Sequence, residues 1–532
     1  MKTKPEKKAF FLPFLVSSSM ILGLLAQNIS EILLRDAFRP LLISVVVTLF
    51  IFGVTYLLVK NLYTASVISS ILLLLFFSYG HVYSLIKSIP SAGAILGRHR
   101  YLLSAWGLIA LVITIVFIRK PSFGTTAVKY LSLVFSLLLA FSLVQIGYAL
   151  GRQAYYEFTY EIPTSTDISL SPTEAPSDIY TGEAPTAQSG LSYSKGPIPP
   201  DIYYIVLDAY GRSDVLKDVY GVDNSDFINS LKDMGFFVAS CSQSNYSRTA
   251  LSLTSTFNMD YLDSLNPDFN PDDSSTAWLL PYLRNNSVRK ILSDIGYKTI
   301  AFQNTHEVLA GDADIIYTPV DFWDHLSPFE GLLFRVTLLR VWVDANGTSA
   351  QLTGDELHRQ EILYTLKELP QIPDIQGPKF VFVHLIIPHP PFVFGPNGES
   401  VDIPPFDVAK GNIYTDEDYK RGYSGSTIYI SDRLKRIIPQ LIEKSDVPPI
   451  IVVAGDHGPD PVGGIQNSVR NLNAYYIPDG SELLYNRITP VNTFRVIFDT
   501  YFNGEYELLP DKSYFSPDSN YFDFIELQND CR

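Results

Sequence analysis

Three short apolar runs after residue 200 carry acidic or imidazole side chains at or just beyond their ends. They are 202–207 (IYYIVL) with Asp208, 380–387 (FVFVHLII) with His384 and His389, and 449–454 (PIIVVA) with Asp456 and His457. Carboxylate oxygen and imidazole nitrogen are ligands for divalent cations such as Zn²⁺, Mn²⁺ and Mg²⁺. If the runs are strands of one sheet, these side chains meet at one edge and predict a metal site with acid–base groups beside it.

Each of these residues also has an ordinary structural explanation. An Asp directly after a strand often caps the next helix, and a His within a buried strand is commonly a hydrogen-bonded core residue. The sequence GDHG at 455–458 is also typical of a tight turn. The metal interpretation is favoured because such residues recur together at the ends of three runs.

A hydroxyl-rich segment at 241–259 (CSQSNYSRTALSLTSTFNM) supplies candidate nucleophiles. A polar loop leads there into a helical stretch that starts near Arg248, and the amino terminus of a helix favours negative charge. A metal beside that position would lower the pKa of a hydroxyl and make it nucleophilic. Thr249 is the first choice, Ser244 and Ser247 are alternatives, and an ordinary helix cap explains Ser247 or Thr249 without chemistry.

The elements that must position these residues alternate between strands and helices. Apolar runs of about 5–8 residues indicate strands buried on both faces, and a further run lies at 299–302. Helical stretches are expected at 224–234, 286–294, 354–368 and 426–444. The alternation predicts an α/β sandwich with a mostly parallel central sheet, and ligands of such folds bind beyond the carboxyl ends of the strands.

The first 150 residues have a different character. Five apolar runs without Asp, Glu, Lys or Arg lie at roughly 9–28, 40–59, 63–86, 101–118 and 130–150. Each is close to the ~20 residues that cross a ~30 Å hydrocarbon core, which favours five transmembrane helices over buried soluble helices or a lone signal peptide. The amino terminus is expected in the cytoplasm because it carries Lys2, Lys4, Lys7 and Lys8. An odd number of spans then places everything after 150 outside.

Charge divides the 532 residues in the same way. Residues 1–152 carry 14 Lys and Arg against 3 Asp and Glu, whereas the whole chain has a formal charge of −15. We therefore expect a transmembrane domain at 1–152, a Pro-, Ser- and Thr-rich linker at 153–199 and an acidic outer domain at 200–532. An acidic chain disfavours nucleic acid as a partner, since phosphate contacts need a basic face.

The only two cysteines, Cys241 and Cys531, exclude a disulfide-rich scaffold or a Cys-rich zinc module. Both lie in the outer domain, where an extracytoplasmic setting permits a disulfide between them. The sequence leaves that pairing open.

The outer domain resembles the alkaline phosphatase superfamily, in the branch of sulfatases, lipoteichoic acid synthase and lipid A phosphoethanolamine transferases. The resemblance covers roughly 200–500 and rests on the motifs IVLDAYGR, RTALSLTSTF, PHPPF and GDHG, in that order behind five spans. It implies that Asp208, Thr249, Asp456 and His457 hold a divalent cation. It also implies Thr249 as the nucleophile, His389 as a substrate-binding or leaving-group histidine with His384 behind it, and Arg248 as a group that offsets the charge of the transferring phosphoryl.

Several residues depart from these families. Sulfatases carry Cys/Ser-x-Pro-Ser-Arg, but the segment SNYSR at 244–248 has no Pro, and Cys241 is misplaced for conversion to formylglycine. Sulfatases also begin with paired Asp, whereas Ala209 follows Asp208, and the transferases usually have Glu where this chain has Asp208. The departures disfavour the sulfatase reading.

The leading hypothesis is a multi-pass cell-membrane enzyme that transfers a phosphoryl group from a phospholipid head group to an envelope glycan or lipid acceptor through a phospho-threonine. A water-using phosphodiesterase or sulfatase is the first alternative, and a non-catalytic envelope assembly protein is the second. Mn, Zn and Mg all suit the expected ligands. Trp323 and His325 are further candidates for the substrate pocket by residue type alone.

Overall fold

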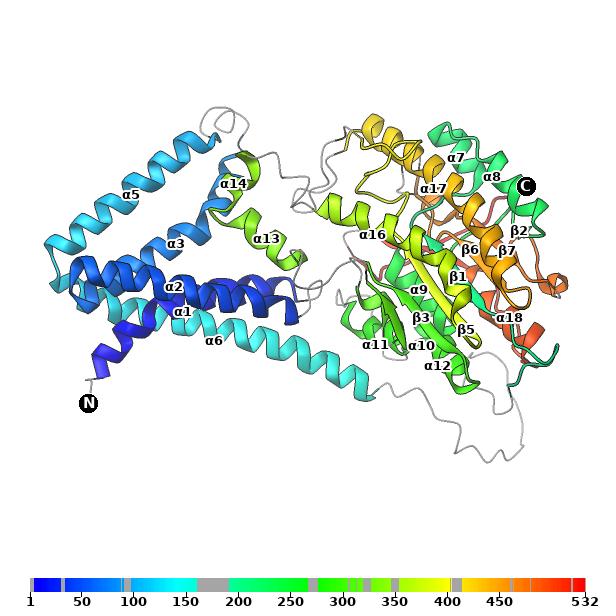
Figure 1. Cartoon of the computed structure of the whole chain (residues 1–532), viewed down its shortest axis with the longest axis horizontal. Coiled ribbons are helices and arrows are strands. Elements are labelled where there is room, and N and C mark those ends of the chain that lie inside the picture. The colour runs from blue at the N-terminus through cyan, green and yellow to red at the C-terminus, as the bar shows by residue number, and fades with distance from the viewer. Residues whose placement is uncertain are drawn as a thin grey trace. The chain divides into compact units, whose positions relative to one another are not determined.

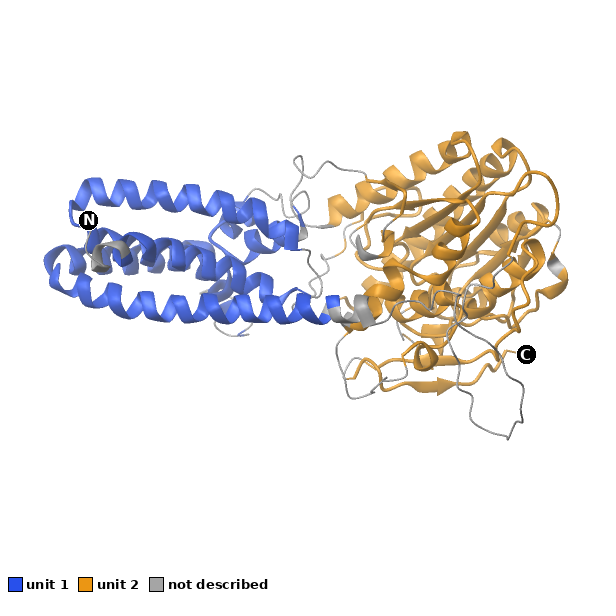
Figure 2. Cartoon of the chain, turned by 90° about the horizontal axis from the view of Figure 1, so that it is seen from below, with its two compact units in different colours: residues 1–154, 320–354 blue, residues 155–319, 355–532 orange. Residues whose placement is uncertain are grey.

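The computed structural model consists of two compact units, coloured separately in Figure 2. The membrane unit comprises residues 1–154 and 320–354, and the α/β unit comprises residues 155–319 and 355–532. The structure describes residues 4–29, 34–87, 89, 97–159, 191–266, 276–304, 307–311, 313–318, 327–345, 354–401, 403, 414–459, 462, 464–478, 480–517 and 520–531. The predicted division at 152 and 199 stays a prediction, and the segment 320–354 of the expected outer domain groups with the membrane unit.

Five helices of the membrane unit are long and apolar enough to cross a bilayer, so the chain is an integral membrane protein. They are α1 (Lys4–Gln27), α2 (Phe38–Val59), α3 (Leu62–Lys87), α5 (His99–Arg119) and α6 (Ser122–Thr159), and a short 3-10 helix, η1 (Leu34–Ala37), precedes α2. The five predicted spans are confirmed. Large apolar side chains on α2, α5 and α6 are exposed on the unit, as expected of faces that contact lipid.

Two short helices from the middle of the chain complete the membrane unit. These are α13 (Pro328–Val336) and α14 (Arg340–Ala345), and both are drawn beside α3 in Figure 1. A capping box starts α13, in which the Ser327 hydroxyl accepts from the backbone N–H of Glu330 and the Glu330 carboxylate accepts from that of Ser327.

The α/β unit is built on a seven-stranded sheet with the order β2-β7-β6-β1-β5-β3-β4. Its strands are β1 (Ile202–Leu207), β2 (Phe237–Val238), β3 (Lys298–Phe302), β4 (Ile315–Tyr317), β5 (Lys379–Leu385), β6 (Ile450–Ala454) and β7 (Asn473–Tyr476). The five strands from β6 to β4 are mutually parallel, whereas β7 pairs antiparallel with both β6 and the edge strand β2. The predicted sandwich with a mostly parallel sheet is confirmed.

Alternate residues of β1 enter two different hydrophobic cores, because successive side chains of a strand point to opposite faces. Ile202, Tyr204 and Val206 pack with α9 (Thr249–Asn258), α11 (Leu279–Arg284), α12 (Ser287–Asp294) and α18 (Thr493–Tyr501). Tyr203, Ile205 and Leu207 pack with α7 (Ser213–Tyr220), α8 (Ser225–Asp233), α16 (Gly354–Glu368) and α17 (Asp416–Lys444). Helices therefore cover both faces of the sheet (Figure 1).

Some elements differ from the sequence expectations. Helix α17 begins at Asp416, ten residues before the predicted start. The part that was not predicted contains Gly422 and Gly425, and glycine is a poor helix former. In the fold, Gly422 instead permits close packing, since a Cβ there would collide with the ring of Phe392. The antiparallel strands β2 and β7 were also not expected, and neither was a C-terminal hairpin of β8 (Ser513–Phe515) and β9 (Ile525–Leu527).

The last residues of the predicted linker lie against the α/β unit. The backbone N–H groups of Ser192 and Ser194 donate to the carbonyls of Phe502 and Tyr501, and the ring of Tyr193 packs beside Phe502. The preceding residues 160–190 lie outside the described part of the chain.

Candidate metal centre

The carboxyl ends of β1 and β6 bring Asp208 and Asp456 together. The two strands are parallel neighbours with Val206 opposite Ala454, so the residues that follow each strand emerge at the same edge of the sheet. Ala209 then turns the chain with a left-handed φ of 60°, which is costly for a residue with a side chain. This turn allows the Ala209 N–H to donate to Asp456 Oδ1 at 3.0 Å.

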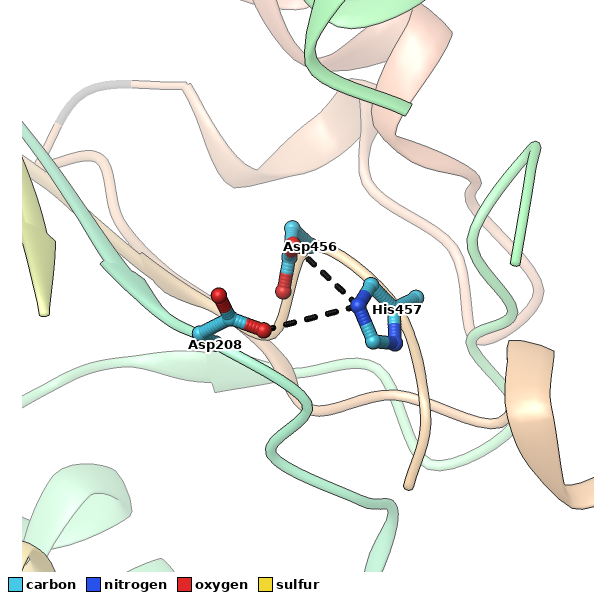
Figure 3. Close-up of side chains that lie close together, drawn as sticks. All are labelled: Asp208, Asp456 and His457. Atoms are coloured by element: carbon cyan, nitrogen blue, oxygen red, sulfur yellow. Dashed lines mark ion pairs between the residues drawn. The ribbon is translucent and has the colours of Figure 1, made fainter. Parts of the chain in front are cut away.

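Asp208, Asp456 and His457 each point one ligand atom into a common space (Figure 3). These three atoms lie within 4.8 Å of one another. His457 Nε2 is 3.4 Å from Asp208 Oδ1 and 3.6 Å from Asp456 Oδ2. All three residues are buried, with 1%, 1% and 7% of their surfaces exposed, so water does little to screen the two carboxylates.

The hydrogen bonds around this cluster fit a cation. His457 Nδ1 lies 2.6 Å from the Gly458 carbonyl, which can only accept, so Nδ1 carries a hydrogen. His457 Nε2 faces the two carboxylates, and within the described structure Asp208 Oδ1 and Asp456 Oδ2 accept no hydrogen bond. Buried carboxylates without compensation are costly, and a divalent ion bound by two oxygens and an imidazole nitrogen would remove the cost.

His384 supports Asp208 from the neighbouring strand. Strand β5 is parallel to β1 with His384 opposite Val206, and His384 Nε2 lies 3.3 Å from Asp208 Oδ2. The Asn304 side-chain amide contacts His384 Nδ1 at 3.2 Å and donates to the His384 carbonyl at 2.7 Å, which holds the ring in place. Burial alone would raise the pKa of Asp208, but His389, His384 and His457 together hold that pKa well below its ordinary value.

Thr249 is the first residue of α9, and its half-buried hydroxyl lies 3.3 Å from His457 Nε2. Ser252 joins the helix to the Asp208–Asp456–His457 group, because its hydroxyl donates to the Asp456 carbonyl at 2.6 Å. The amino-terminal N–H groups and the dipole of α9 therefore lie beside the hydroxyl, where they favour negative charge on its oxygen.

The alternative hydroxyls have other partners. Ser244 is fully buried, and its hydroxyl donates to the Tyr246 carbonyl at 2.9 Å. The Ser247 hydroxyl accepts from the Ser516 backbone N–H at 2.9 Å. The hydroxyls of Ser244 and Ser247 therefore bond to backbone groups of the loop and of Ser516, whereas the Thr249 hydroxyl contacts His457.

Arg248 contacts the segment around the C-terminal hairpin. Its guanidinium donates to the Ser516 carbonyl at 3.0 Å and lies 5.1 Å from the ring centroid of Tyr521. Nearby, Cys241 and Cys531 form the disulfide that the sequence left open. These contacts attach the C-terminal segment to the loop that precedes Thr249.

His389 lies next to the cluster without joining the group of three. Its backbone N–H donates to the Asp208 carbonyl at 3.1 Å, and its ring is edge-on to His457 with centroids 6.3 Å apart. Nδ1 lies 2.6 Å from the Pro390 carbonyl. Trp323 and His325 lie outside the described residues.

Sequence reasoning missed two supporting residues. Asn304 follows β3 by two residues, and the rule that polar groups gather at the carboxyl ends of parallel strands would have found it. Ser252 stands within the motif RTALS, but its bond to the Asp456 carbonyl joins residues 204 positions apart and is visible only in the fold.

The fold and the site define an enzyme of the alkaline phosphatase superfamily, a transferase or hydrolase with an acidic and imidazole cluster at a strand end. A family model described as Sulfatase matches residues 200–494. The match spans more than half of the chain, and the chain therefore belongs to the sulfatase family. A search of curated proteins finds no match.

Several solved structures resemble the chain at low identity. The C-terminal periplasmic domain of EptC from Escherichia coli, in complex with zinc, is 11% identical with a TM-score of 0.42, covering 63% of this chain and 94% of that one. The integral membrane lipooligosaccharide phosphoethanolamine transferase A from Neisseria meningitidis is 12% identical with a TM-score of 0.40, covering 92% and 95%. The phosphonate monoester hydrolase of Agrobacterium radiobacter is 13% identical with a TM-score of 0.40, covering 60% and 80%.

Proposed function

We propose that this protein is a metal-dependent phosphoryl transferase that acts on phospholipid head groups at the outer face of the cell membrane. The acceptor is a hydroxyl of an envelope glycan or lipid. The observation that carries the proposal is the position of the Thr249 hydroxyl, 3.3 Å from His457 Nε2, at a helix amino terminus beside two buried carboxylates. This arrangement suits attack by a hydroxyl on a phosphodiester.

The proposed metal ligands are Asp208, Asp456, His457 and the Thr249 hydroxyl. Mn²⁺, Zn²⁺ and Mg²⁺ are all compatible with oxygen and nitrogen donors. A divalent ion held by these residues would supply charge stabilisation for the hydroxyl and for the phosphoryl oxygens.

The remaining steps fall to the chain's own residues. The Thr249 hydroxyl loses its proton to water and its oxygen attacks the phosphorus, the bond from phosphorus to the lipid alcohol breaks, and His389 gives a proton to the departing alcohol. An acceptor hydroxyl then attacks the phospho-threonine and loses its proton to His389. The bond from phosphorus to the Thr249 oxygen breaks, and this oxygen takes a proton from water to restore the hydroxyl. His384 holds Asp208 from behind. The contacts of Arg248 with Ser516 favour a role in holding the start of α9, and its predicted charge-offset role stays a prediction.

The membrane helices have a physical purpose in this proposal. Four lysines before the first span favour a cytoplasmic amino terminus, which puts the α/β unit outside. Attachment to the bilayer raises the effective concentration of a lipid donor at the site.

A water-using phosphodiesterase is the second candidate, since the family to which the chain belongs is named for hydrolases. Conversion to formylglycine, as in a true sulfatase, is disfavoured because Cys241 is bonded to Cys531 and Ser244 is fully buried.

The test uses the Thr249→Ala variant of the full chain with Ser247→Ala as the matched control. Thr249→Ala should lower turnover of a phosphodiester at least about 10³-fold, since the nucleophile is lost. Ser247→Ala should remain within a few-fold of the parent protein. Mass spectrometry of the acid-quenched parent protein should find the phosphoryl group on a peptide that contains Thr249. Unchanged turnover in Thr249→Ala would reject the nucleophile, and transfer to water alone would favour the phosphodiesterase.

A further inference from the structure

Residues 327–345, here called the inserted hairpin, lie within the sequence of the α/β domain but pack entirely in the membrane unit (Figure 2). The hairpin consists of α13, a turn and α14, and its apolar side chains join those of the membrane helices. Phe329 and Leu333 belong to the core that contains residues of α1 and α3. Leu338 and Val341 pack against Tyr79 and its neighbours.

The turn of the hairpin contacts the backbone of α3 directly. The Leu338 N–H donates to the Phe76 carbonyl at 2.9 Å, and the backbone of Arg335 and Val336 lies against Gly80. A Cβ at Gly80 would overlap these backbone atoms, so the absence of a side chain there permits the approach. Two backbones that meet this closely indicate a built interface.

Charged residues on both helices of the hairpin bind side chains of three different membrane helices. Glu330 on α13 pairs with Arg39 of α2 at an Nε–Oε1 distance of 2.5 Å, with both side chains mostly buried. On α14, Asp344 lies 2.7 Å from His99 Nε2 of α5. A third contact joins α14 to α3, because Arg340 donates to the Ser84 hydroxyl at 2.8 Å. The Arg39–Glu330 pair favours this position of the hairpin, because either partner left alone would be a costly, mostly buried charge.

The chain length on either side of the hairpin limits how far the α/β unit can move. Residues 319–326 and 346–354 separate the hairpin from the nearest described residues of the α/β unit, Thr318 and Asp355. A fully extended chain spans at most about 3.5 Å per residue, so each connection reaches about 30 Å whatever its conformation. The linker 160–190 could reach on the order of 110 Å by the same measure.

We infer that the inserted hairpin is a second membrane tether, and that it rather than the linker limits the reach of the α/β unit. The partner surface is the one formed by α2, α3 and α5 of the same chain. If the proposed function holds, this tether keeps the metal centre close enough to the bilayer for a lipid head group to enter.

The tether can be tested without measuring activity. In the full chain in lipid vesicles, a protease recognition sequence replaces residues 170–176, and the fraction of the C-terminal fragment that sediments with the vesicles is measured after cleavage. We expect the fragment to remain on the vesicles. In a variant whose residues 327–345 are replaced by Gly and Ser, the fragment should be released. Release from the parent protein, or retention in the replacement variant, would overturn the inference.

Point variants sharpen the same assay. Gly80→Leu should release the fragment at least fivefold more than the matched control Gly107→Leu, because a Cβ at Gly107 meets nothing within 4 Å. Arg39→Glu should also increase release, and adding Glu330→Arg should restore retention by re-forming the pair. Equal release from the two glycine variants, together with no rescue by the charge swap, would contradict the role of this interface.

A substrate comparison separates this inference from the proposed function. The replacement variant should turn over a water-soluble phosphodiester within twofold of the parent protein and a vesicle lipid at least tenfold more slowly. If the parent protein turns over neither substrate, the proposed function fails while the release assay still decides the tether. Equal loss on both substrates would contradict the reach limit.

Discussion

The two units of this protein each contain a cluster of buried charged groups, and the clusters differ in one respect. In the membrane unit, Arg39 and Glu330 neutralise each other, and Glu330 also caps α13. In the α/β unit, Asp208 and Asp456 lie beside His457, but neither Asp208 Oδ1 nor Asp456 Oδ2 accepts a hydrogen bond in the described structure. The first cluster is complete within the chain, and the second has the charge and the ligand atoms for a cation.

This difference separates structural charges from functional ones. A buried charge that is paired with an opposite charge fixes two segments relative to each other and requires no bound ion. Two buried carboxylates that face His457 Nε2 across a common space are costly without positive charge beside them, which favours a metal site. The comparison predicts opposite responses when one member of each cluster is changed.

The largest effect is expected from Asp456→Asn. Losing one of the carboxylate ligands should empty the proposed site and lower kcat/KM for a phosphodiester by about 10³-fold or more, since metal assistance supplies several kcal/mol. The fold should remain intact, because the change removes an unneutralised buried charge. Elemental analysis and kinetics check this, with the exposed Asp226→Asn as control. Full metal content and activity in Asp456→Asn would contradict the proposal that Asp456 binds the metal ion.

Glu330→Gln should give the opposite result. Arg39 would remain mostly buried without its carboxylate, so the membrane unit should lose about 3 kcal/mol of stability. Metal content and turnover of a water-soluble substrate should stay unchanged. Thermal unfolding in detergent checks the stability, and the double variant Arg39→Gln/Glu330→Gln should recover part of the loss. A variant as stable as the parent protein would show that the pair is dispensable.

Metal itself should stabilise only the α/β unit. At a free concentration one hundred times the dissociation constant, a bound ion adds about 2.7 kcal/mol to the stability of the unit that binds it. Thermal unfolding of the chelator-treated protein, followed with and without Mn²⁺, Zn²⁺ or Mg²⁺, checks this. The shift should vanish in Asp456→Asn and persist in Glu330→Gln. An equal shift in both variants would place the ion elsewhere.

The smallest effect is expected from Ser252→Ala. The change removes the hydrogen bond from α9 to the Asp456 carbonyl, worth about 1 kcal/mol. It should lower kcat about fivefold, because Thr249 would be held less firmly beside His457 and Asp456. Ser255→Ala removes a comparable bond to the Asp260 carbonyl and should cost similar stability without lowering kcat. Equal kcat in the two variants would deny Ser252 a positioning role.

Local pattern was sufficient for much of the architecture. The spans follow from uncharged runs of about 20 residues, and β1 was predicted residue for residue because its six positions are apolar and the first five are β-branched or aromatic. The family was predicted from motifs that occur in a fixed order, and the family model confirms it. The expected ligands Asp208, Asp456 and His457 do lie together, since parallel strands end at one edge, but their role as a metal site stays a proposal.

The inserted hairpin could not be predicted in the same way. Its stretch from Pro328 to Val343 is shorter than a span and carries Glu330, Arg335 and Arg340, so it reads as an ordinary amphipathic segment of the outer domain. The early start of α17 was missed for a related reason. Glycine disfavours a helix in the sequence, and only the fold shows that Gly422 packs directly against the ring of Phe392.

By itself, the sequence determined which segments cross the membrane, the alternation of four central strands with helices, and the chemical types available at the strand ends. These depend on hydropathy and on residues that are near each other in the chain. Only the tertiary structure decided that Thr249 rather than Ser244 faces His457, that Arg248 contacts Ser516, and that residues 327–345 return to the membrane helices. Those outcomes depend on contacts between residues hundreds of positions apart, which no local pattern encodes.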